Sequence, residues 1–179
     1  MEQQQQIGAF SLDVLTQPIQ PHEIEWRVQQ QTKTGKIIVV PYITNRCVME
    51  RFDRQFGWHG WQNEILEIQD GFLCKITATI TGPDGAAIRT VTKTDGANRT
   101  DIEPIKGGIS DAMKRCAVQF GLGRNLYDYP RVFIETPDKF IPEWAGPQLE
   151  ALVKKINDGT YKGGDFVTLK ASYRQPQAA

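Results

Sequence analysis

The segment from residue 61 to 94 constrains the fold most, because an alternating pattern lies there between two strong turn signals. In "FLCKITATI" one side carries Phe72, Cys74, Ile76, Ala78 and Ile80, and the other carries Leu73, Lys75, Thr77 and Thr79. This period of two predicts a half-buried strand. Asp70-Gly71 before it and Gly82-Pro83-Asp84-Gly85 after it predict hairpin turns. With "WQNEILEI" and "AAIRTVTKT" on either side, the sequence predicts three antiparallel strands.

Two amphipathic segments flank these strands and predict helices. "TNRCVMERFDRQFGW" has Thr44 as a plausible N-cap and Gly57 as a stop, with a buried stripe of Val48, Met49, Phe52 and Phe56. After a predicted loop, "DGANRTDIEPIKGG", comes a second helix that ends at Gly121 and Gly123. Its apolar residues recur every three or four positions: Ile109, Met113, Cys116, Ala117 and Phe120.

An N-terminal hairpin is predicted ahead of this helix-strand-helix core. "EIEWRVQQQTKTGKIIVVPYI" reads as two strands around Gly35, and Pro41 favours an edge position or a bend. The predicted fold class is α+β, an antiparallel sheet made of this hairpin and the three strands, with helices packed on one face.

The remaining segments set the expected domain limits. Residues 1–8 are predicted to be disordered, 9–158 to form one domain and 159–179 to form a flexible tail. Within the domain we expect a helical turn in "FSLDVL", an irregular proline-rich stretch in "LYDYPRVFIETPDKFIPEW" and a last helix in "GPQLEALVKKIND".

Charge and cysteine usage narrow the function classes. The formal net charge is zero, which disfavours a generally basic nucleic-acid-binding domain but leaves room for a local basic stripe. Residues 106–131 are such a basic stretch.

The three widely spaced cysteines sit in apolar patterns and predict reduced, buried thiols. Neither zinc-ligand spacing, a leader nor a membrane span is apparent, so we expect a cytoplasmic protein without metal or cofactor.

Lys114 and Arg115 lie side by side off the apolar stripe of the second helix. They could form a solvated face, with Asp111 paired to Arg115 at i+4, or a phosphate site. Arg46, early in the first helix, could point the same way if both helices pack on one sheet. In "FGWHGW" the aromatic residues more often staple a helix to a sheet than stack on bases, and Trp58 is the more exposed candidate.

Enzyme signatures are weak. "GLGRNLY" follows a helix and lacks a Lys-Ser/Thr ending, which fits a glycine helix stop better than a phosphate-binding loop. Pro83-Asp84 has no Glu-x-Lys on the following strand, which disfavours nuclease chemistry. We therefore expect no catalytic residues.

Two blocks carry a resemblance. "SDAMKRCAVQFGLGRNLYD" resembles the signature helix of the Rad52/22 single-strand annealing family, and "VPYITNRCVMERFDRQFGWHGW" resembles a second block of that family, in the same order. The resemblance covers about residues 24–130, and the compact size is most similar to the short bacterial members.

The resemblance implies a DNA repair protein that binds single-stranded DNA in a basic groove around an oligomeric ring and promotes annealing of complementary strands without ATP. Its groove cations map onto Arg46, Lys114 and Arg115, and Trp58 occupies an aromatic position linked to DNA binding. Lys93, Arg99 and Lys106 complete the candidate set. Val118 and Pro83 stand where some relatives carry cations, which favours end protection over strong annealing. We expect no membrane or small-molecule partner.

Two alternatives stay open. A double-stranded RNA-binding module has the same helix, three strands, helix order, although it usually carries a dense lysine cluster and a Gly-Pro-x-His loop. The second alternative is an enzyme that processes DNA ends. The sequence disfavours it, because the carboxylate and metal-ligand pattern of such enzymes is missing.

Overall fold

The computed structural model describes residues 13–82 and 84–171, which divide into two compact units. Of the described residues, the first unit comprises 13–17 and 44–124, and the second comprises 18–43 and 125–171. The single domain predicted over residues 9–158 includes residues of both units, and its limits stay a prediction. The predicted disorder of residues 1–8 lies outside the described residues.

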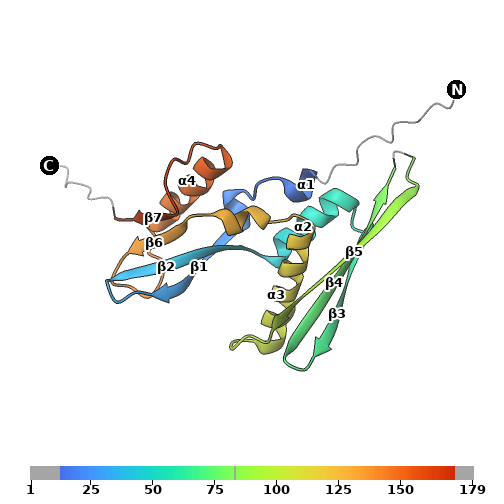
Figure 1. Cartoon of the computed structure of the whole chain (residues 1–179), viewed down its shortest axis with the longest axis horizontal. Coiled ribbons are helices and arrows are strands. Elements are labelled where there is room, and N and C mark those ends of the chain that lie inside the picture. The colour runs from blue at the N-terminus through green and yellow to red at the C-terminus, as the bar shows by residue number, and fades with distance from the viewer. Residues whose placement is uncertain (1–12, 83, 172–179) are drawn as a thin grey trace. The chain divides into compact units, whose positions relative to one another are not determined.

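The first unit is the predicted helix-strand-helix core (Figure 1). A short α1 (Asp13–Thr16) precedes α2 (Asn45–Phe56), and then come β3 (Trp61–Ile68), β4 (Gly71–Thr81), β5 (Ala87–Asn98) and α3 (Pro104–Gln119). The three strands form an antiparallel sheet in the order β3-β4-β5. Helix α3 packs on β4 and β5, over the predicted apolar side of β4.

Helix α2 begins and ends as predicted, but its buried side differs from the predicted stripe. The Thr44 side chain accepts a hydrogen bond from the Cys47 amide at 3.2 Å, and Gly57 ends the helix with φ of 75°. Met49 is 42% exposed, whereas Arg51 is only 2% exposed. The Arg51 guanidinium donates to the Val14 carbonyl at 2.6 Å, because α1 itself packs against this side of α2.

Strand β5 and helix α3 extend into the segment that was predicted to be a loop. Strand β5 continues to Asn98 and α3 begins at Pro104. A Cβ on Gly108 would lie 2.7 Å from the Phe72 ring and 3.1 Å from the Asn98 carbonyl oxygen. Glycine here therefore lets the first turns of α3 approach the sheet, so its role is close packing rather than loop flexibility.

The second unit is a separate α+β layer. It contains η1 (Pro21–Glu23), β1 (Ile24–Gln31), β2 (Lys36–Ile43), β6 (Arg131–Glu135), α4 (Ala145–Asn157) and β7 (Phe166–Leu169), with η2 (Arg124–Asp128) at the boundary. Its sheet has the order β1-β2-β6-β7, and α4 covers one face through an apolar core. Helix α4 confirms the last predicted helix.

Three predictions about this unit need correction. The N-terminal hairpin forms its own sheet with β6 and β7, so the described residues form two sheets instead of the predicted one. Strand β6 lies in the stretch predicted to be irregular, because Val132 and Ile134 are buried against α4. Strand β7 lies in the predicted tail and pairs in parallel with β6, where Leu169 enters the core.

The three cysteines are buried and unpaired by disulfides, as predicted. Cys74 on β4 faces Cys116 on α3, and the hydrogen bond between these thiols, together with burial, raises the pKa of Cys74 above its usual value. Across the described ranges, no helix is long and apolar enough to cross a membrane.

Candidate nucleic-acid interface

Lys114 and Arg115 lie outside the buried stripe of α3, with side chains that are 21% and 54% exposed, and each has a carboxylate partner. Lys114 Nζ lies 2.8 Å from Asp111 Oδ1, one turn earlier on the same helix. Arg115 Nε lies 3.2 Å from Asp95 Oδ1 on β5. The predicted pair between Asp111 and Arg115 is therefore wrong. Consecutive side chains on a helix point about 100° apart. Lys114 therefore pairs with Asp111 on the same helix, whereas Arg115 points towards Asp95 on the neighbouring strand.

Asp95 is held in place by several donors. Its carboxylate accepts from the Gly96 amide at 2.7 Å and from Gln119 Nε2 at 3.3 Å, in addition to Arg115. Burial alone would raise the pKa of Asp95, but the hydrogen bonds from Gly96 and Gln119 and the charge of Arg115 lower it below its usual value. Asp95 thus stays ionised and fixes the direction of Arg115.

Lys93 lies on β5, the strand towards which Arg115 points from α3. It is two residues from Asp95 on β5, so both side chains are on the sheet face that α3 covers. The Cys116 thiol donates to the Lys93 carbonyl at 3.2 Å, which places this part of α3 beside Lys93. The Lys93 ammonium is exposed and has no ion pair with any described residue.

Arg99 and Lys106 are engaged with carboxylates farther along the unit. Arg99 pairs with Glu67 on β3, and its guanidinium lies 4.8 Å from the centre of the Phe72 ring. Lys106 Nζ lies 3.0 Å from Glu103 at the start of α3. These contacts reduce the positive potential that either cation offers to a phosphate.

Arg46 lies exposed in the first turn of α2 and makes no ion pair within residues 13–82 or 84–171. Helices α2 and α3 contact each other, with Phe52 and Phe120 in an edge-to-face arrangement at 5.3 Å. The four cations therefore belong to one unit and lie on α2, α3 and β5: Arg46, Lys93, Lys114 and Arg115.

Trp58 and Trp61 have different roles. Trp61 lies 5.1 Å from the Phe52 ring and donates its indole N–H to Asp53 at 2.8 Å, which fastens α2 to β3. Trp58 is 80% exposed. Its ring lies in a T-shaped arrangement with the ring of His59, and the two ring centres are 5.4 Å apart. The expectation that Trp58 is the exposed member of this cluster is confirmed.

Two other arginines of the unit support the structure. Besides Arg51, Arg124 donates to the Val118 and Gln119 carbonyls at 3.0 and 3.2 Å, which satisfies carbonyls at the end of α3. The sequence shows no signal that separates these arginines from surface cations, because only tertiary contacts identify their acceptors.

A shallow cavity of about 430 Å³ in the second unit is lined by Tyr127, Tyr129, Tyr161, Asp128 and Asp165, with backbone and apolar atoms. Since no lysine or arginine lines it, this cavity does not suit a phosphate. Within the described part of the chain, no cluster of three His, Cys, Asp or Glu residues could hold a metal ion.

Residues 11–144 match the model of the Rad52/22 family of double-strand break repair proteins, and the chain belongs to this family. Among its relatives is the single-stranded DNA-binding protein DdrA of Deinococcus deserti, which is 30% identical over 147 residues. This alignment covers 76% of the chain and 70% of the relative. DdrA of Deinococcus radiodurans is 28% identical, over 76% of the chain and 67% of the relative. The predicted family and its short bacterial branch are confirmed.

Proposed function

We propose that this chain is a DNA repair protein that binds single-stranded DNA without sequence preference and protects strand ends, anneals complementary strands, or does both. The family and the names of the relatives support this proposal. The observation that carries it is the adjacent pair Lys114 and Arg115, which lies outside the buried stripe of α3 in the family's signature segment.

Sequence-independent binding needs contacts to phosphates, because bases must stay available for pairing. Lysine and arginine supply these contacts and release the counterions condensed on the DNA. The Arg115 side chain is 54% exposed, and exposed ion pairs contribute only about 0–1 kcal/mol, so a phosphate can compete with Asp95 for its guanidinium. The proposed groove therefore uses Arg46, Lys93, Lys114 and Arg115, with Trp58 as a stacking residue and with Arg99 and Lys106 as more distant, compensated cations.

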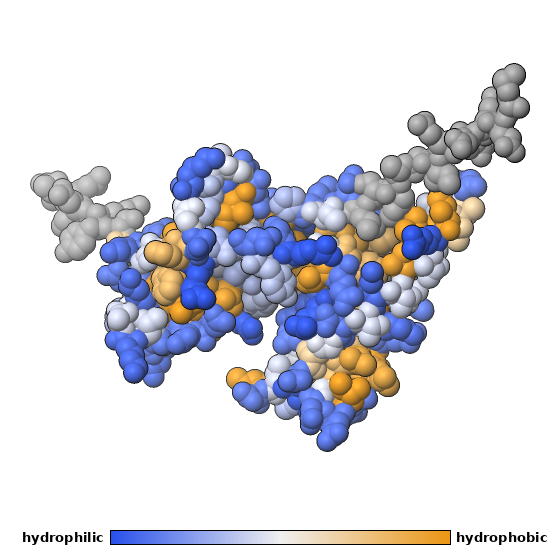
Figure 2. All heavy atoms as spheres, viewed as in Figure 1, coloured by the Kyte–Doolittle hydropathy of each residue, from blue (hydrophilic) through white to orange (hydrophobic). Residues whose placement is uncertain are grey.

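A few cations per chain bind weakly, and repetition around a ring would make later contacts intramolecular and raise the overall affinity. The outer edges of β3 and β5 are unpaired within their sheet, and such edges can pair with a neighbouring copy. Leu66 and Ile68 on β3 are exposed, and hydrophobic surface is visible over the sheet of the first unit (Figure 2). We propose a homo-oligomeric ring that works without ATP at the bacterial nucleoid.

The family match favours this function over a double-stranded RNA-binding module. Competition separates the two: unlabelled double-stranded RNA should displace a labelled DNA oligonucleotide poorly. Mass measurement of the purified protein with and without oligonucleotide tests the ring, because a monomer would contradict it.

The binding site is tested by Lys114→Ala combined with Arg115→Ala. We expect a sharp loss of affinity for single-stranded DNA with the oligomer intact. The slope of log affinity against log salt should fall by about 1.4, from 0.7 for each of two phosphates. Lys154→Ala with Lys155→Ala is the matched control, since this exposed adjacent pair lies on α4 of the second unit. Wild-type affinity and slope in the first variant would refute the site.

A further inference from the structure

The second unit presents a sheet face with the composition of a base-stacking surface. On β2 and β6 the residues Ile37, Val39, Val132 and Ile134 are buried against α4. Since side chains alternate along a strand, the intervening residues lie on the opposite face. We call this the open face and define it by Arg27, Tyr42, Arg131, Phe133 and Phe166.

Aromatic rings are accessible on the open face. Phe166 on β7 is 68% exposed, and its ring lies edge-to-face with that of Phe133 on β6 at 6.4 Å. Tyr42 on β2 lies under the guanidinium of Arg27 at 6.0 Å. Hydrophobic surface interrupts hydrophilic surface over β6 and β7 (Figure 2). An exposed phenylalanine that contacts only the edge of another ring leaves a flat surface on which a base can stack.

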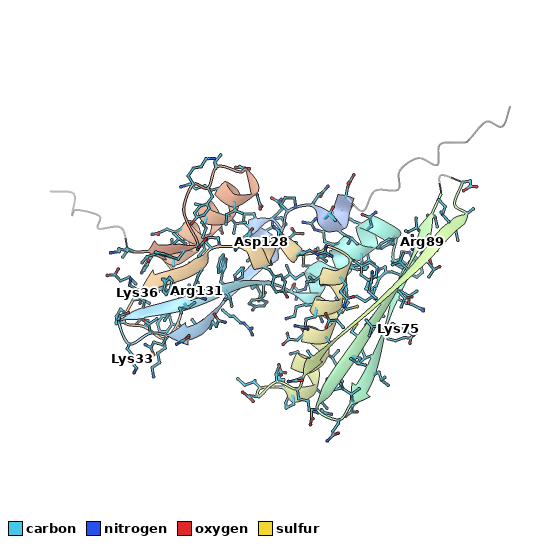
Figure 3. The ribbon with its side chains drawn as sticks, viewed as in Figure 1. Lys33, Lys36, Lys75, Arg89, Asp128 and Arg131 are labelled. Carbon is cyan, nitrogen blue, oxygen red and sulfur yellow. The ribbon has the colours of Figure 1, made fainter. Side chains whose placement is uncertain are left out.

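Cations accompany these rings, and the carboxylates of this face are already engaged. Arg27 and Arg131 make no ion pair with any described residue. Glu135 pairs with Lys170 at 3.0 Å, and Glu25 accepts a hydrogen bond from the Tyr42 hydroxyl at 2.6 Å. Lys36 and Arg131 lie on strands of the same sheet (Figure 3). The face is therefore complementary to a polyanion.

We infer that the open face is a second binding surface for single-stranded nucleic acid, which stacks bases on Phe133 and Phe166 and contacts phosphates through Arg27 and Arg131. The inference takes the nature of the partner from the proposed function but uses a different unit of the chain. Stacking tolerates any base, so this surface adds affinity without sequence preference. It differs from the α3 site in requiring bases as well as phosphates.

An abasic oligonucleotide separates the two sites. The full chain is titrated with oligothymidylate and with an abasic strand that has the same number of phosphates. Phe166→Ala should weaken binding of oligothymidylate about fivefold or more and change binding of the abasic strand less than twofold. Phe166→Trp should keep wild-type affinity for oligothymidylate. Phe140→Ala is the control, since this 65% exposed phenylalanine lies outside the strands.

The outcomes distinguish failure of this inference from failure of the proposed function. If Phe166→Ala keeps the wild-type ratio between the two oligonucleotides while the Lys114/Arg115 variant weakens both, the open face is refuted and the α3 site stands. If wild type binds neither oligonucleotide, both proposals fail. Ultraviolet crosslinking to oligothymidylate gives a second measurement. Crosslinked peptides that contain Phe133 or Phe166 support the open face, and crosslinks confined to residues 44–124 overturn it.

Discussion

The guanidinium of Arg115 on α3 lies 3.2 Å from the carboxylate of Asp95 on β5. This contact joins the signature helix to the edge strand of its sheet, and Gln119 binds the same carboxylate. Asp95 therefore positions a cation of the proposed DNA site, and it also competes with phosphate for that cation. The predictions for Asp95 follow from these two roles.

Asp95→Asn should strengthen binding of single-stranded DNA. The amide keeps a hydrogen-bond acceptor for Arg115 but removes the negative charge, and one unit charge at about 4 Å in water corresponds to about 1 kcal/mol. We expect an increase in affinity of up to about fivefold at low salt, measured by fluorescence anisotropy. Asp84→Asn, in the hairpin turn between β4 and β5, is the control for the change in net charge. Binding unchanged from wild type would show that Arg115 does not contact DNA.

Asp95 should also make stability depend on pH at the acid end. Its folded-state pKa is lowered, so its contribution to the free energy of unfolding is present above the unfolded-state pKa of about 4. That contribution is lost as the pH falls through the lower, folded-state pKa. The difference in unfolding free energy between wild type and Asp95→Asn should therefore shrink below about pH 4. A constant difference from pH 7 to pH 2 would contradict this assignment.

Trp58 and Trp61 should separate binding from stability. Trp58→Ala should leave thermal stability nearly unchanged, because the side chain is 80% exposed, and should weaken DNA binding by about 1–3 kcal/mol if a base stacks there. Trp61→Ala should lower stability by about 3 kcal/mol or more, because it removes a ring packed on Phe52 and the hydrogen bond to Asp53. Urea unfolding and anisotropy on both variants check this, and equal effects on stability would count against it.

Gly108 should not tolerate a side chain. Gly108→Ala places a methyl group against the buried Phe72 ring and the Asn98 carbonyl, so we expect a loss of about 1–3 kcal/mol in unfolding free energy. Gly146→Ala in α4 is the matched control, because a Cβ there meets no atom within 4 Å. The control should be neutral or stabilising by up to about 1 kcal/mol. Similar stability of the two variants would mean that α3 can move away from the sheet.

The sequence predicted the local features well where one periodic signal dominates. The alternation in β4 is strict, and Thr44 and Gly57 mark the ends of α2 because capping needs only neighbouring backbone groups. The two blocks around α2 and α3 were enough to predict the family that the comparison identifies. These features depend on contacts close in sequence.

Other features depended on the tertiary structure. Arg51 and Arg115 look alike in the sequence, yet one donates to a carbonyl that α1 brings close and the other pairs with a carboxylate from β5. Strand β7 has four residues and is held by its parallel pairing with β6, so composition alone suggested a tail. The assignment of the N-terminal hairpin to a second sheet followed from β6, a partner about 90 residues away. Local periodicity carries no information about the distant partner of a strand or of a charged side chain. That partner is determined when the whole unit buries its apolar surface.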